Sequence, residues 1–319
     1  MRGAVEGLAR IEIVTSDLVE ALSFGDVVLA VVPAYAHADI AKHAAEHVRD
    51  EQYILLCPGR TGGALEFSET LRNRGARGRP VIAEAQTILH TCRLGATGAD
   101  VEVFAVKHVV SLAALPATRT KDLLGILKPL FPQFAEAESV LETSLNNMGA
   151  MLHPAPTLLN IGWIETLRTQ FLHYYEGITP AVAGLLEIMD RERLAVAAGL
   201  GTRALSITEW LDKTYGAEGD SVYDALHSNE AYREIFAPSS IHHRYFFEDI
   251  PTGLTPIASI GDAVGVDTPT MDAMILLASK ACRVDFQARG RSASSLGLSN
   301  PGSASMRDRI YGENRSSLS

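Results

Sequence analysis

Three side chains between positions 153 and 249 could protonate a substrate group and hold a carboxylate. His153 follows the run Asn146–Leu152, and Arg244 and Asp249 lie further on, five residues apart. An imidazole can act as a general acid near neutrality, and a carboxylate can orient it. A guanidinium can bind a substrate carboxylate through two hydrogen bonds. Together they offer what a dehydrogenase needs.

Each of these residues also has a plain structural interpretation. A histidine that follows a helix-like stretch is usually a structural residue whose hydrogen bonds are satisfied. Arg244 and Asp249 could form a surface ion pair, which contributes little energy. The functional hypothesis therefore depends on the elements that must bring the three residues together.

The bulk composition is that of a globular protein. A length of 319 residues suggests two domains, each able to bury its own core. With 47% hydrophobic and 21% charged residues, the chain differs from disordered sequences. A formal net charge of −10 argues against a nucleic-acid partner and mildly against anionic membranes.

The sequence also indicates whether the protein spans a membrane, which compartment it occupies and whether it binds a metal. The longest apolar run, Val27–Val32, is too short for a membrane span, and we expect no leader peptide. The three cysteines lie far apart without a C-x-x-C pair, which is typical of a reducing cytoplasm. His43 and His47 are four residues apart, but no acidic or thiol ligand completes a set. We therefore predict a cytoplasmic protein without a metal.

The first half of the chain alternates strand-like and helix-like segments. Unbroken Val/Leu/Ala runs are typical of strands buried on both faces of a parallel sheet, and the alternation predicts a doubly wound (Rossmann-type) α/β domain over residues 1–137. The expected strands are Arg10–Thr15, Asp26–Val32, Tyr53–Cys57 and Pro80–Glu84, followed by a strand pair Val101–Val106 and Val109–Leu115. The expected helices are Leu18–Ser23, Ala36–Val48 and Gly62–Arg74.

From Leu123 the apolar residues repeat with the helical period of 3.6. One stripe includes Val182, Leu186 and Met189, and another includes Met271 and Met274. The pattern predicts that residues 138–319 form an all-helical substrate and catalytic domain.

The segment before Arg10–Thr15 lacks an expected motif. A nucleotide-binding α/β domain normally begins with a strand, a glycine turn and a helix that bind the pyrophosphate. Only Met1–Ala9 stands there, whereas one βαβ unit takes roughly 30 residues. A fold that never had this unit is one interpretation. We favour a truncated dinucleotide-binding domain, through a deletion or a mis-assigned start, with impaired folding and cofactor affinity.

Several blocks of sequence, in their order and spacing, resemble the octopine/nopaline (opine) dehydrogenase family. The resemblance covers nearly all of the chain except the amino-terminal segment of the family. The blocks are Asp26–His37, Pro58–Glu66, Ala83–Glu84, Cys92–Arg93, Asn146–Asn147, His153–Pro154, Arg244–Leu254, Asp285 and Gly290–Leu298.

This resemblance implies an oxidoreductase that uses NAD or NADP. In such enzymes the amino group of an L-amino acid condenses with a 2-oxo acid such as pyruvate, and the imine is reduced to a secondary amine. His153 matches the catalytic histidine of the family, and Asp249 matches its acidic partner. Arg244 would then hold a substrate carboxylate.

The resemblance also suggests where the cofactor lies. Pro33 and the loop that contains Gly59, Arg60 and Gly62 follow two predicted strands, where open parallel sheets bind their ligands. We interpret these residues as cofactor contacts, and Arg60 could meet a phosphate. An ordinary tight turn is the alternative. The sequence does not separate NAD from NADP.

Thr87 and Cys92 occupy positions that line the substrate pocket in the family. The chain departs from the family pattern over residues 85–90, which leaves the amino-acid substrate open. We interpret Cys92 as a pocket residue rather than a nucleophile, since no base can be assigned to it.

Two other functions remain open at this point. The chain could be a non-catalytic remnant that acts as a helical association module. It could also be a 2-oxo or 2-hydroxy acid dehydrogenase of the same superfamily, because His153 and Asp249 would serve that reaction too. A homodimer is possible in each case.

Overall fold

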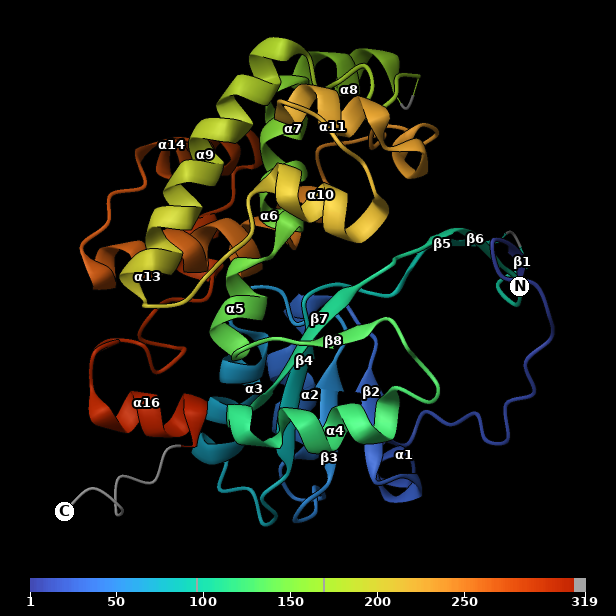
Figure 1. Ribbon diagram of the computed structural model, residues 1–319, viewed down its shortest axis with the longest axis vertical. Helices are drawn as coiled ribbons and strands as arrows, with labels where there is room; N and C mark the ends of the chain where they lie inside the picture. The colour runs from blue at the N-terminus through green and yellow to red at the C-terminus, as the bar shows by residue number, and fades with distance from the viewer. Residues whose placement is uncertain (96, 169, 313–319) are drawn as a thin grey trace.

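The computed structural model describes residues 1–95, 97–168 and 170–312. A sheet half and a helical half lie one above the other in Figure 1. The main sheet has the order β2-β3-β4-β7-β8, in which β7 is antiparallel to β4 and the other neighbours are parallel. Its strands are β2 (Val27–Ala30), β3 (Tyr53–Leu56), β4 (Val81–Ala85), β7 (Val110–Leu115) and β8 (Phe134–Glu136).

Helices cover both faces of this sheet, as in a Rossmann-type fold. Successive residues of β3 point to opposite faces, so Ile54 packs in one core cluster with Phe67, and Leu55 packs in a second with Leu123. The three predicted helices are confirmed with different ends as α1 (Leu18–Phe24), α2 (His37–Ala44) and α3 (Gly63–Asn73). A fourth helix of this half, α4 (Thr120–Leu127), was not among the predicted ones.

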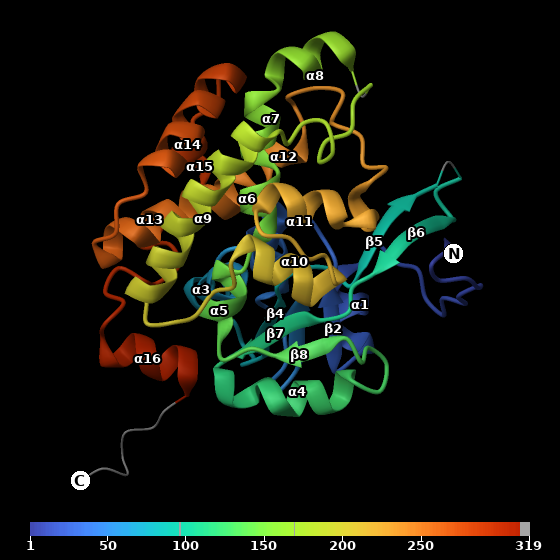
Figure 2. The same ribbon diagram turned by 45° about the horizontal axis from the view of Figure 1, so that its top comes forward.

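A long antiparallel ribbon extends from the main sheet. β5 (His90–Leu94) continues from β4, and β6 (Val101–Val106) leads into β7, so that β5 pairs with β6 beyond the β4–β7 pair. Its end projects from the body of the molecule near the N-terminus (Figure 2), where β1 (Arg2–Gly3) joins it. The predicted pairing of Val101–Val106 with Val109–Leu115 is therefore wrong, because both segments belong to one arm of the ribbon.

Two predictions about the edge of the sheet at β2 are wrong. Arg10–Thr15 forms no strand. A strand needs a hydrogen-bonded neighbour, and this segment does not pair with the free edge of β2, which in the described residues pairs only with β3. The prediction that Asp26–Val32 is buried on both faces is also wrong. Leu29 and Val31 are 37% and 63% exposed, because β2 lies at the edge of the sheet.

The strands end with β8, and helices follow from α5 onward. One hydrophobic cluster includes residues of both halves, so the division between residues 137 and 138 stays a prediction. No helix of the described ranges combines the length and the apolar character needed to cross a membrane. The helices are α5 (Val140–Leu145), α6 (Met148–Leu152), α7 (Pro154–Leu159), α8 (Ile161–Leu167), α9 (Pro180–Gly199), α10 (Ile207–Tyr215), α11 (Val222–Ser228), α12 (Arg244–Phe247), α13 (Thr255–Val264), α14 (Pro269–Cys282), α15 (Phe286–Arg289) and α16 (Ala304–Tyr311), with a π-helical turn at Ile250–Leu254 and 3-10 turns at Ala34–Ala36, Ala117–Arg119 and Glu230–Tyr232.

The last helix returns to the sheet half. α16 lies beside α3 at the lower left of Figure 1, and an ion pair joins Arg309 to Glu69 of α3. The region after α5 is thus helical in the described residues, but its final helix packs on the first half.

Candidate active site

A cavity of about 350 Å³ lies between the two halves of the molecule. It is the place where most of the residues predicted from the sequence meet. Asp249 lies behind the wall and is fully buried, while Gly59 and Gly62 lie outside the lining. The predicted residues that line the cavity are Pro33, Arg60, Thr87, Cys92, His153 and Arg244.

His153 and Asp249 form a hydrogen-bonded pair at the cavity wall. His153 stands between α6 and α7, and its Nδ1 lies 2.7 Å from Oδ2 of Asp249. Because an ionised carboxylate only accepts hydrogen bonds, Nδ1 carries a proton, and Nε2 faces the Tyr174 hydroxyl at 3.1 Å. The imidazole stacks on Tyr245, with ring centroids 4.1 Å apart. These contacts fix the tautomer and leave Nε2 for chemistry.

Two glycines allow the close packing that brings Asp249 to His153. The π-helical turn after Asp249 rests on α6, and a Cβ on Gly253 would lie 2.7 Å from Ala150 Cβ. A Cβ on Gly149 would lie 2.0 Å from an Arg60 guanidinium nitrogen. A side chain at either position would therefore push these elements apart.

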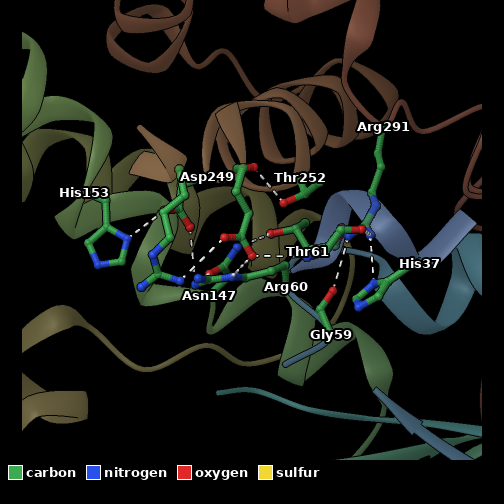
Figure 3. Close-up of polar contacts among 12 residues, drawn as sticks. His37, Gly59, Arg60, Thr61, Asn147, His153, Asp249, Thr252 and Arg291 are labelled. Atoms are coloured by element: carbon green, nitrogen blue, oxygen red, sulfur yellow. Dashed lines mark hydrogen bonds and ion pairs between the residues drawn. The ribbon is translucent and has the colours of Figure 1, made fainter. Parts of the chain in front are cut away.

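Arg60 is buried at the centre of a network of acidic and amide groups (Figure 3). One guanidinium nitrogen lies 3.3 Å from Asp249 Oδ1 and also donates to Asn147 Oδ1 at 3.3 Å. Its Nε lies 3.5 Å from Glu248 Oε1, which also accepts from the Ala34 amide at 3.1 Å. The structure thus places Arg60 in the catalytic network, and its predicted contact with a cofactor phosphate stays a prediction.

The charges in this network set the protonation states. Burial raises the pKa of Asp249, but Arg60 and then His153 outweigh this effect and lower it to about 2. Burial lowers the pKa of His153, which Asp249 partly opposes and Arg244 and Arg60 reinforce. Burial raises the pKa of Tyr174, so its hydroxyl stays neutral. The free site therefore holds an ionised Asp249 beside a neutral imidazole.

Arg291 fastens the loop that carries Arg60. Its guanidinium donates to the carbonyl oxygens of Gly59 at 3.2 Å and Thr61 at 2.8 Å (Figure 3). It also donates to His37 Nδ1 at 3.1 Å and forms an ion pair with Glu66 at 2.8 Å. Because burial, Arg291 and Arg60 lower the pKa of His37 to about 3, the imidazole remains a neutral acceptor. The position of this loop therefore depends on a residue that lies more than two hundred positions away in the sequence.

The predicted substrate-side residues lie on the walls around His153. Arg244 begins α12, and its side chain is 55% exposed, with one guanidinium nitrogen 3.6 Å from Glu248 Oε2. Thr87 is partly buried, and its carbonyl oxygen accepts from the Cys57 thiol at 3.8 Å. Cys92 is an exposed, unpaired thiol. A substrate can reach all three from the cavity.

The structure gives contacts to four residues for which the sequence predicted no role. Tyr174 and Tyr245 contact the imidazole of His153, and Glu248 and Asn147 contact Arg60. Glu248 follows Arg244 by four residues, the spacing of an ion pair on a helix, which is the signal that could have found it. The tyrosines had no signal, because a tyrosine among apolar residues usually serves as a core residue.

The sheet side of the cavity fits the nicotinamide end of a dinucleotide. Val31, Val32 and Pro33 follow β2, and Cys57 and Pro58 follow β3, so the carboxyl ends of two parallel strands open into the cavity. Doubly wound sheets bind dinucleotides at this edge. These mostly apolar residues and the imidazole of His153 line the same cavity, which offers a flat ring and a substrate a common site.

Comparisons with known proteins agree with this geometry. Residues 136–282 match the family described as NAD/NADP octopine/nopaline dehydrogenase, alpha-helical domain. An opine dehydrogenase of Arthrobacter sp. (strain 1C) is 42% identical over 304 residues, which cover 95% of this chain and 84% of that protein. Octopine dehydrogenase of Pecten maximus is 26% identical over 88% of this chain and 76% of that protein.

Solved structures show the same likeness. A structure of octopine dehydrogenase with NADH and L-arginine matches with a TM-score of 0.77 and 25% identity, and it covers 96% of this chain and 83% of that chain. A structure of octopine dehydrogenase with NADH and pyruvate matches with a TM-score of 0.75 and covers 91% of this chain and 79% of that chain. The fold and the arrangement of the two halves therefore have close structural counterparts.

Proposed function

The chain belongs to the octopine/nopaline (opine) dehydrogenase family, and on that premise we propose that it joins an L-amino acid to a 2-oxo acid such as pyruvate by NAD(P)H-dependent reductive condensation. The observation that carries this proposal is the His153–Asp249 pair, held at 2.7 Å on the wall of a cavity that opens onto the carboxyl edge of the sheet.

His153 supplies the proton in this reaction. Condensation forms a C=N bond between the amine and the oxo carbon and releases the oxo oxygen as water. When NAD(P)H is bound, it supplies the hydride that reduces this bond to a secondary amine. Protonated Nε2 of His153 can donate to the oxo oxygen, take back a proton that the condensing amine releases, and then donate this proton to the imine nitrogen. Asp249 stabilises the imidazolium through Nδ1.

The remaining predicted residues take supporting roles. Arg244 binds the carboxylate of the oxo acid, since its guanidinium is partly exposed at the cavity wall. Thr87 and Cys92 line the part of the cavity that receives the amino acid.

Four residues are the proposed cofactor contacts. Pro33 and Arg60 line the cavity, and Gly59 and Gly62 support them from the loop that Arg291 fastens. The octopine dehydrogenase structures hold NADH, and a structure of yersinopine dehydrogenase holds NADP⁺, so both cofactors need testing.

An assay of nicotinamide oxidation tests the proposal. Purified protein is given NADH or NADPH with pyruvate, with and without a panel of L-amino acids. We expect oxidation that depends on both substrates. Oxidation with pyruvate alone would favour a 2-oxo acid reductase. The absence of nucleotide binding up to millimolar concentration would favour an association module and contradict the enzyme.

Two properties accompany the proposed function. All three cysteines are unpaired thiols, which supports a reducing compartment such as the cytoplasm. Homodimer formation is a further prediction, and sedimentation velocity of the purified protein tests it.

A further inference from the structure

Lys107 is a buried cation that lines the cavity and has no counter-ion among the residues that the structure describes. It stands between β6 and β7, where the ribbon bends, and its backbone amide donates to the Leu89 carbonyl. Only 5% of the residue is exposed, and Nζ lies 5.8 Å from the centre of the Tyr215 ring. Among the described residues, no carboxylate lies within 4.0 Å of this ammonium group.

The neighbouring titratable groups leave this charge uncompensated. Burial raises the pKa of the Cys57 thiol to about 11, so the thiol stays neutral. Burial and then the Lys107 charge lower the pKa of His90, which therefore carries no charge at neutrality. Lysine is rarely buried without a partner, because an ammonium group that leaves water needs a compensating interaction. A group that enters the cavity can supply it.

The other cations of the cavity differ from Lys107. Arg60 faces the carboxylates of Asp249 and Glu248, and Arg244 lies close to Glu248. Arg93 lies on an exposed strand. Within the described part of the wall, Lys107 is thus the buried cation without an acidic neighbour, and Glu248 is the one acidic side chain in the lining.

We propose that Lys107 binds the carboxylate of the amino-acid substrate. The proposal rests on the proposed function, whose product carries two carboxylates. Arg244 reaches the cavity from the helical half and holds the oxo acid, while Lys107 reaches it from the sheet half and holds the amino acid. The α-carboxylate and an acidic side chain offer the same chemistry to the ammonium group.

This assignment also defines the class of amino acid. A cationic side chain would meet Lys107 and Arg93, whereas the one acidic group in the described lining already faces Arg60 and Arg244. Amino acids with neutral or acidic side chains are therefore the expected substrates. A higher kcat/KM for L-arginine than for L-alanine and L-glutamate would overturn this part of the proposal.

Steady-state kinetics of Lys107→Met test the assignment. Methionine keeps the length and apolar character of the stem and removes the charge. The KM for L-alanine and L-glutamate should rise about 10- to 100-fold, the loss expected for a hydrogen bond between charged groups. A rise for L-glutamate alone would assign Lys107 to the side-chain carboxylate. The KM for pyruvate and the Kd for NADH should change by less than about twofold.

Two further variants separate binding from folding. Lys107→Arg keeps the charge and should recover part of the affinity for the amino acid. Lys213→Met removes a positive charge from the exposed face of α10, outside the cavity lining, and should leave every constant unchanged. An unchanged KM for the amino acid in Lys107→Met, or an equal loss of NADH affinity, would overturn the proposal.

A binding measurement keeps the test independent of turnover. If the wild-type protein oxidises no nicotinamide, the proposed function fails, and calorimetry with N-(1-carboxyethyl)-L-alanine then decides the role of Lys107. Binding that weakens about 10-fold or more in Lys107→Met supports the assignment. Equal binding by the two proteins, or none by the wild type, contradicts it.

Discussion

His153 and Arg60 bind the two oxygens of a single buried carboxylate. Asp249 places Oδ2 at 2.7 Å from the imidazole and Oδ1 at 3.3 Å from the guanidinium. Arg60 stabilises the ionised carboxylate, and its positive charge also opposes protonation of the imidazole. A residue of the sheet half therefore adds to burial and to Arg244 in lowering the pKa of the proposed proton donor.

Replacing Arg60 should change the pH dependence of the reaction. Condensation needs protonated His153, so kcat falls as pH rises through the pKa of the imidazole. The Arg60 charge lowers this pKa, and Arg60→Gln should move the alkaline limb of kcat toward higher pH. Arg60→Lys keeps the charge and should move it less. A limb that stays in place, or moves toward acid, would contradict the coupling.

Gly149→Ala should act in the same direction through sterics alone. The added Cβ would lie 2.0 Å from the Arg60 guanidinium and 2.8 Å from Asp249 Oδ1, so the guanidinium must move away from the carboxylate. The alkaline limb of kcat should again shift toward higher pH. Gly184→Ala, in α9, is the matched control, because its Cβ meets nothing within 4 Å. Identical profiles for the two alanine variants would refute the steric argument.

Arg244→Lys should weaken binding of the oxo acid. Lysine keeps the charge but cannot reproduce the two parallel hydrogen bonds of a guanidinium. The KM for pyruvate should rise about 10-fold, the loss of roughly one charged hydrogen bond, while the Kd for NADH stays constant. A KM equal to that of the parent protein would show that Arg244 makes no bidentate contact.

His173 should make the protein less stable in acid. Burial, and then the nearby His153, lower its pKa from 6.5 to about 3, and its Nε2 donates to the Leu152 carbonyl at 3.2 Å. Between these pH values the unfolded chain binds a proton that the folded protein does not. Stability therefore falls as pH drops from 6.5 toward 3, by up to about 1.4 kcal/mol per pH unit from this group.

Urea unfolding at several pH values measures this contribution. His173→Gln keeps a donor for the Leu152 carbonyl but does not titrate, so its unfolding free energy should fall less steeply between pH 6 and pH 4. The difference between the two proteins at pH 8 gives the cost of the altered packing and is subtracted. Parallel curves would contradict the assignment.

The sequence predicts those features of the fold that depend on local pattern. The apolar strand Tyr53–Cys57 and the helix from Gly62 to Arg74 are confirmed as β3 and α3, because an unbroken apolar run and a helical period specify them directly. The pairing of β6 with β5 could not be predicted from the sequence, since the pattern of a strand does not reveal which strand it pairs with. Arg10–Thr15 shows the same limit, because an extended pattern forms no strand without a neighbour.

Only those site residues that match the motifs of a known family could be predicted from the sequence. His153 and Asp249 were chosen on that basis, and the structure brings them into contact across 96 positions of sequence. The placement of Arg60 was not predictable, because its partners lie just before α6 (Asn147) and just after α12 (Glu248 and Asp249). Lys107 had no signal at all, since an isolated lysine between two strands resembles any surface residue. Its burial is a property of the folded structure, in which the Tyr215 ring at the end of α10 lies near its ammonium group.

The most direct test of the proposed reaction follows the hydride and its dependence on His153. NADH that carries deuterium in the transferred position at C4 is incubated with the protein, pyruvate and an L-amino acid, and the product is analysed by mass spectrometry. We predict a secondary amine dicarboxylate with one deuterium on the carbon that came from the oxo group. His153→Asn should lower kcat about 10²- to 10⁴-fold without changing the Kd for NADH. Deuterium in lactate alone, or turnover by His153→Asn at the parental rate, would contradict the account.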